Sequence, residues 1–96
     1  MNKLILDSAS AYLSGPQRKL LRAQDEDRQS KHGYLTSAQL YDCDWKTGAN
    51  KELISALWYL TAAAIASNDE KKKRVIEAAK LYVVDSLHLL DTIRGK

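Results

Sequence analysis

The sequence is poor in the residues that form turns. Its 96 residues include four glycines and one proline, fewer than an all-β fold with many tight turns requires. The single cysteine, Cys43, excludes an internal disulfide and fits a reducing cytoplasm. No apolar run approaches the ~18 residues of a membrane-spanning helix, and the run Leu4–Leu6 is too short for a signal peptide. These absences favour a helical cytoplasmic protein that does not enter the membrane.

The overall composition is that of an ordinary globular domain. Apolar residues make up 45% and charged residues 28% of the chain, so disorder is not expected. The length of 96 residues predicts one domain. A net charge of +3 permits contact with nucleic acid or an acidic partner but requires neither.

Residues 1–46 predict short helices and connectors. Asn2 is the expected cap of a first helix, which residues 14–16 end because Gly15 can take the left-handed C-cap conformation and a proline follows. A second helix is expected over residues 16–30. Residues 36–39 form a Thr-x-x-Gln capping box that opens a short third helix.

Residues 47–96 predict two long helices. The first runs from Thr47, its expected cap, to about Ala66, and the second runs from a capping box at residues 67–70 to about Ile93. No glycine or proline occurs between Leu53 and Ile93, so one continuous helix remains an alternative. An antiparallel hairpin is preferred because residues 67–74 include no apolar side chain and a break there removes no core contact.

Both long helices are apolar on more sides than one packing partner can cover. The first carries Leu53, Ile54, Leu57, Trp58, Leu60 and Ile65. The second carries Val75, Ile76, Leu81, Tyr82, Val83, Val84, Leu87, Leu89, Leu90 and Ile93. A helix that is apolar all round is normally buried, and the rest of this chain offers little to bury it. Part of this surface is therefore expected to contact another chain.

The predicted fold is all-α. It is a small bundle of four to five helices in a single domain, residues 1–96, with a long C-terminal antiparallel αα-hairpin across which the first two helices pack. The predicted core residues are Ile5, Leu13, Leu20, Leu57, Trp58, Leu60, Ile65, Ile76, Val83, Leu87 and Leu90.

The aromatic residues favour an interface. The chain has five tyrosines, two tryptophans and no phenylalanine, and tyrosine and tryptophan suit surfaces that are half wet. Trp58 and Tyr59 are adjacent, so they point about 100° apart on a helix. Alternatively, one of the two lies in the core and the other on the surface. The candidate interface residues are Trp58, Tyr59, Leu81, Tyr82, Val84 and Leu89.

The basic run at residues 71–74 is the one dense cluster of positive charge. Its position at a helix start indicates a phosphate site, since free backbone amides there also attract anions. The candidate contacts are Lys71, Lys72, Lys73 and Arg74, extended by Arg18, Lys19 and Arg22 if the second helix packs nearby. The alternative is a solvated face neutralised by Asp69, Glu70 and Glu77.

No motif in the chain indicates a reaction. Cys43, His32 and His88 lack the spacing of a metal site and have no local catalytic signature, so we expect no enzyme activity, no metal and no cofactor. The predicted function is a non-catalytic protein–protein interaction module. It would regulate or inhibit a larger protein by occupying its surface, or would homodimerise, as do small regulators that phages and mobile elements encode. A nucleic-acid or nucleotide phosphate binder is the alternative.

Overall fold

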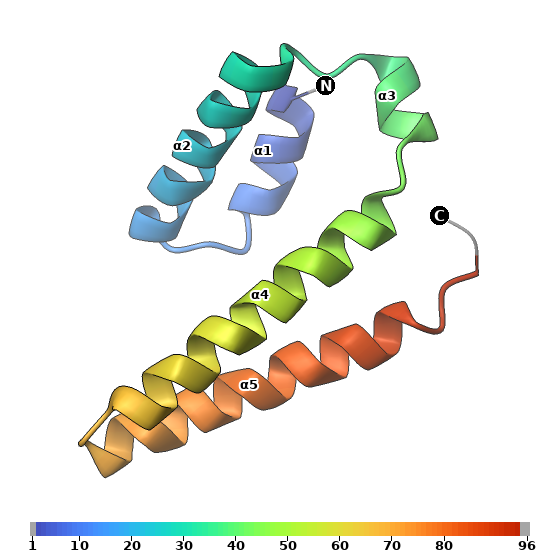
Figure 1. Ribbon diagram of the computed structural model, residues 1–96. Coiled ribbons are helices and arrows are strands. Elements are labelled where there is room, and N and C mark those ends of the chain that lie inside the picture. Colours follow the sequence, from blue (N-terminus) through green and yellow to red (C-terminus); the bar gives the residue numbers. More distant parts are fainter. Residues whose placement is uncertain (1, 95–96) are drawn as a thin grey trace. The chain divides into compact units, whose positions relative to one another are not determined.

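The computed structural model describes residues 2–94 (Figure 1). Its helices are α1 (Asn2–Ser10), α2 (Gly15–His32), α3 (Ser37–Asp42), α4 (Trp45–Ala66) and α5 (Glu70–Leu90). No β-strand occurs within these described residues. The predicted all-α class is therefore confirmed.

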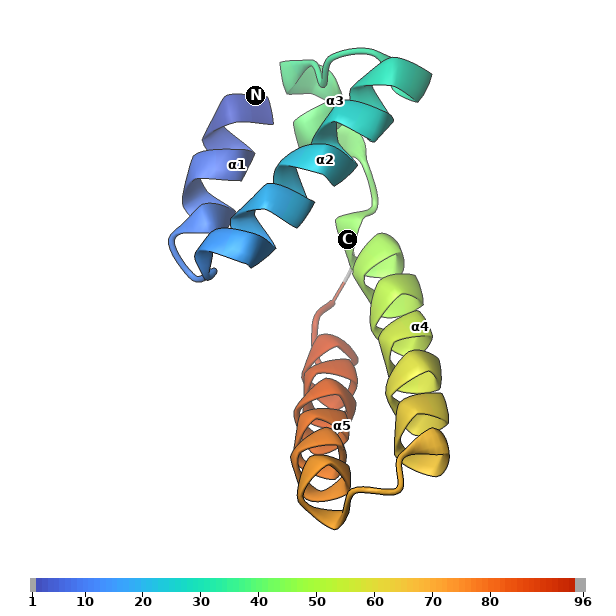
Figure 2. The ribbon, with the colours of Figure 1, turned by 90° about the vertical axis from the view of Figure 1, so that its left-hand side faces the viewer.

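The chain divides into two compact units, Met1–Cys43 and Asp44–Lys96, and each is described here by itself. In the first unit α1 lies against α2, and in the second α4 and α5 run antiparallel side by side (Figures 1 and 2). This boundary lies three residues before the expected change at residues 46/47. The packing of the first two helices across the hairpin stays a prediction.

Polar side chains connect α1 to α2. The Asn2 amide donates to Asp25 Oδ1 over 2.9 Å and its Oδ1 accepts from the Leu35 backbone N–H over 2.8 Å. Gln29 Nε2 donates to Asp25 Oδ2 over 2.6 Å, and Asp25 is only 9% exposed. The prediction that Asn2 caps the first helix is wrong, because Asn2 is the first residue of α1 and its side chain bonds to α2 and to the segment after it.

The connection between α1 and α2 depends on Ser14. Its hydroxyl accepts from the Gln17 backbone N–H over 3.3 Å, while the Gln17 side chain accepts from the Ser14 N–H over 3.0 Å. Because Ser14 caps α2, the helix begins at Gly15. The expected left-handed C-cap at Gly15 is therefore wrong. The glycine with a positive φ, 76°, is Gly33 after α2.

The sequence pattern predicts the start of α3 correctly but not that of α4. The capping box of Thr36 with Gln39 is confirmed, with bonds of 3.1 and 2.9 Å. The cap of α4 is Asp44 rather than Thr47, because the Asp44 carboxylate accepts from both the Thr47 N–H (3.1 Å) and its hydroxyl (2.6 Å). An aspartate also complements the positive helix end better than a threonine.

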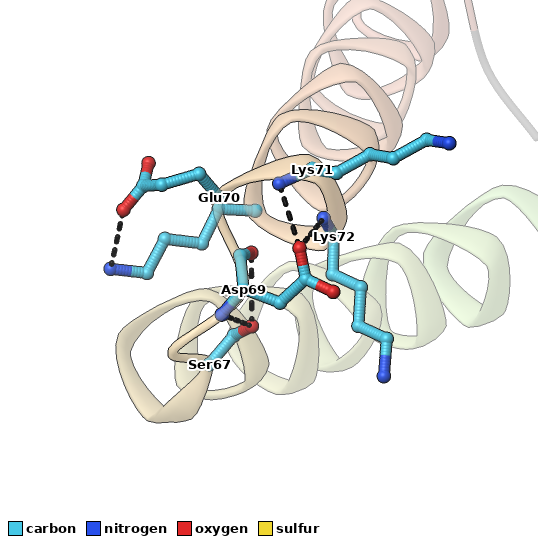
Figure 3. A network of polar contacts seen from close by, with 6 residues as sticks. Ser67, Asp69, Glu70, Lys71 and Lys72 are labelled. Atoms are coloured by element: carbon cyan, nitrogen blue, oxygen red, sulfur yellow. Dashed lines mark hydrogen bonds and ion pairs between the residues drawn. The ribbon is translucent and has the colours of Figure 1, made fainter.

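Residues 67–69 separate α4 from α5 (Figure 3). The cap of α5 is Asp69, which accepts from the backbone N–H groups of Lys71 (2.9 Å) and Lys72 (3.3 Å). Ser67 ends α4, and its hydroxyl bonds to the backbone of Asp69. The expected capping box at residues 67–70 is therefore wrong. At the other end α5 stops at Leu90, three residues earlier than expected; the predicted stop at Gly95 lies outside the described residues.

The core of the hairpin is thin. Apolar side chains on the facing stripes of α4 and α5 are half-buried, and among apolar residues within 2–94 the fully buried one is Ala64, at 8% exposure. Four predicted core residues are instead exposed: Ile5 (41%), Leu20 (66%), Trp58 (69%) and Ile65 (80%). Two paired helices cover one stripe on each other, so every further apolar stripe faces solvent.

Candidate interaction surfaces of the helical hairpin

One exposed apolar stripe lies on α4 alone. Ile54, Trp58 and Ile65 are 57%, 69% and 80% exposed. Their spacing of four and seven residues places them on one side of the helix. We call these three residues the tryptophan face. It is the largest exposed apolar stripe on α4 and it includes an aromatic ring suited to anchor a partner.

A second apolar surface is shared by both helices of the hairpin. An open groove of about 710 Å³ runs between Ala49, Leu53 and Ala56 of α4 and Ser86 and Leu89 of α5, with Glu52 and Leu90 also in its lining. Its lining is almost entirely apolar, so water in the groove has few polar partners. A groove of this kind between two helices suits an apolar side chain of another helix.

Helical spacing extends this groove along the hairpin. Ala63 lies seven residues after Ala56, while Val75 and Tyr82 precede Leu89 by fourteen and seven residues. Residues seven apart share a helix face, so the surface continues toward the turn. We define the groove face as Ala49, Ala56 and Ala63 of α4 with Val75, Tyr82 and Leu89 of α5.

The tryptophan face and the groove face lie on different sides of α4. Trp58 follows Ala56 by two residues, a rotation of about 200° around the helix. Tyr59 lies between the two surfaces and is 67% exposed. Its ring meets that of Trp58 edge-on, with centroids 5.2 Å apart and an interplanar angle of 88°. The expectation that one of these two rings occupies the core is wrong.

The candidate interface residues of α5 differ in how far their side chains are exposed. Leu81, Tyr82 and Leu89 are 66%, 75% and 67% exposed, whereas Val84 is half-buried in the hairpin. The alanines of the groove face are absent from the predicted interface set, because short side chains carry little apolar signal in a sequence. A seven-residue repeat of alanine at positions 49, 56 and 63 was the available signal.

The basic run lies on the first turns of α5. The Asp69 carboxylate already accepts from two of the free amides there, so the expected phosphate-binding amides are partly occupied (Figure 3). Lys73 Nζ forms an ion pair with Glu70 Oε1 over 3.8 Å. The side chains of Lys71, Lys72 and Arg74 are exposed and have no ion-pair partner within residues 2–94.

The remaining anion candidates belong to the other unit. Arg18 Nε donates to the Ser10 carbonyl over 2.9 Å, so it satisfies the end of α1. Arg18 and Arg22 line a groove between α1 and α2 that Asp7 and Glu26 also line, which mixes both signs of charge. Lys19 is exposed on α2.

Across residues 2–94, no three histidine, cysteine, aspartate or glutamate side chains gather as metal ligands do. No helix within that range has the length and apolar character to cross a membrane. Comparisons with family models, with curated proteins and with solved structures gave no match.

Proposed function

We propose that this protein is a small non-catalytic interaction module that regulates or inhibits a larger protein by covering part of its surface. The observation that carries the proposal is the exposure of large apolar and aromatic side chains on both sides of α4. Trp58, at 69% exposure, is the central one. Side chains of this kind, clustered on a rigid helix, are the usual anchors of protein interfaces.

The mechanism is steric occupation of a partner's binding surface. Ile54, Trp58 and Ile65 project from one side of a 22-residue helix, so they can fill a groove on a partner as an amphipathic helix does. Tyr59 flanks them and contributes a hydroxyl at the rim. The edge contact between the two aromatic rings restricts both before binding, which lowers the entropy lost on association.

The alternative function is binding of a nucleic acid or nucleotide phosphate. The exposed side chains of Lys71, Lys72 and Arg74 favour it. The Asp69 carboxylate weighs against it, because it neutralises part of the positive end of α5 and occupies its amides. The alternative predicts an affinity that falls steeply with salt and vanishes when residues 71–74 are all replaced by alanine.

The test is affinity capture from a lysate of the source cells, with and without nuclease, read by mass spectrometry. The proposal predicts one stoichiometric protein that survives nuclease and is lost with Trp58→Asp. Leu81→Asp is the matched control, since it adds the same charge at a similarly exposed apolar position, 66%, on α5 and outside the tryptophan face. Recovery that disappears with nuclease and with the fourfold alanine variant at residues 71–74 would establish the alternative instead.

A further inference from the structure

The groove face is large enough to support a stable dimer. α4 and α5 have 22 and 21 residues. At about 1.5 Å per residue and about 10 Å per helix width, one side of the hairpin covers roughly 600 Å² as a flat rectangle. The true surface is corrugated and therefore larger. It exceeds the ~500 Å² per partner that a specific interface needs and approaches the ~800 Å² of a standard one.

The two helices present side chains of opposite size at this face. α4 contributes alanines at 49, 56 and 63, and α5 contributes Val75, Tyr82 and Leu89, each set repeating every seven residues. The three α5 side chains are at least 66% exposed, so nothing within the hairpin covers them. A stripe of large side chains and a stripe of small ones at the same repeat are complementary in shape.

The register of the hairpin aligns these two stripes. Lys46 Nζ donates to the Ile93 carbonyl over 3.2 Å, which places these residues at about the same level. Counting forward along α4 and back along α5, Ala49, Ala56 and Ala63 are each within one residue of Leu89, Tyr82 and Val75. The groove lined by Ala49, Ala56 and Leu89 agrees with this alignment.

We propose that the groove face binds the groove face of a second copy of this chain, which forms an antiparallel four-helix bundle. A two-fold axis parallel to the helices places α5 of each copy over α4 of the other and keeps every residue at its level. Tyr82 then packs on Ala56 of the second copy, Val75 on Ala63 and Leu89 on Ala49. This inference extends the proposed function, since it leaves the tryptophan face free for a larger protein.

The first test measures mass by sedimentation equilibrium over a range of concentrations. The wild-type chain is expected at twice 10.8 kDa. Tyr82→Asp should raise the dissociation constant by more than about tenfold, because it buries a charge in the apolar interface. Leu81→Asp is the matched control, with a similar exposure on another side of α5, and should leave the mass unchanged. A monomeric wild-type chain, or equal effects of both variants, would overturn the proposal.

The second test fixes the arrangement of the helices by cross-linking. In a Cys43→Ser background, one chain carries Ala56→Cys and another carries Tyr82→Cys, and the two are refolded together and oxidised. The expected product is a disulfide between the two different chains, with none in either chain alone. A disulfide between two Ala56→Cys chains would place α4 over α4 and would overturn the arrangement, as would the absence of any cross-link.

The two proposals fail in different ways. A monomeric chain that still captures its protein partner through Trp58 would reject the dimer and retain the interaction module. A dimer disrupted by Tyr82→Asp that captures no partner through Trp58 would retain the dimer and reject the regulator.

Discussion

The two units of this chain are held together by different kinds of interaction. In the first, α1 and α2 are joined by polar contacts through Asn2, Asp25 and Arg18. In the second, α4 and α5 are joined by facing apolar stripes around Ala64. Polar pairs are satisfied within the chain, whereas apolar helices with one neighbour each still expose the rest of their apolar surface. Both units expose large apolar side chains, including Tyr12 and Leu20 in the first, but in the second these side chains form stripes along two long helices.

A charge placed among the facing apolar side chains of α4 and α5 is expected to have the largest effect of any single substitution. Leu57 is half-buried on the inner side of α4, so Leu57→Asp places a carboxylate among apolar side chains at a cost of several kcal/mol. We expect cooperative thermal unfolding, followed by circular dichroism, to be lost. Trp58→Asp, one residue away but exposed, should retain a cooperative transition. A normal transition in Leu57→Asp would show that the facing apolar side chains of α4 and α5 do not hold the second unit together.

A smaller effect is expected from removing the buried carboxylate of the first unit. Asp25→Ala leaves Asn2 Nδ2 and Gln29 Nε2 without their acceptor, which costs about 1–3 kcal/mol. Hydrogen exchange should accelerate in α1 and α2 but not in α4 and α5. Asp25→Asn keeps one acceptor oxygen, so its exchange rates in α1 and α2 should lie between those of the wild type and of Asp25→Ala. Acceleration spread equally over all helices would remove the distinction between polar and apolar units.

The turn between α4 and α5 offers two candidate caps for α5, Asp69 and Ser67. Asp69→Ala removes the acceptor for two backbone N–H groups and should lower the free energy of unfolding by about 1 kcal/mol. Ser67→Ala should cost less, because Ser67 bonds only within the turn. Urea denaturation of both variants measures this difference. A larger loss in Ser67→Ala would restore Ser67 as the cap that the sequence pattern indicates.

Sequence patterns predicted the helices better than their ends. The break between α4 and α5 coincides with the stretch that lacks apolar residues, and the Thr36 capping box is where the pattern puts it. Asp44, Asp69 and Ser14 were missed as caps because several residues in each connection can cap, and three-dimensional geometry selects among them.

The exposed surfaces of the hairpin could likewise be predicted only in part from the sequence. Apolar periodicity placed Tyr82 and Leu89 among the residues that one neighbour cannot cover, and both are exposed, but it also placed Trp58 in the core, where it does not lie. It could not say which of them share a side of the hairpin. That depends on the register between α4 and α5, which the Lys46 bond to Ile93 and the lining of the groove supply.

The smallest expected effect concerns the charge at the edge of the groove face. Glu52 is one of the residues that line the groove, so dimer formation is expected to remove its side chain partly from water. Glu52→Ala should tighten the dimer by a few-fold, since partial burial of a charge without a partner costs on the order of 1 kcal/mol. Glu70→Ala, which removes an exposed charge outside the groove, should change the dissociation constant little. Sedimentation equilibrium of both variants decides the point. A weaker dimer in Glu52→Ala would mean that this carboxylate has a partner across the interface, and that the hairpin, like the first unit, also relies on polar contacts.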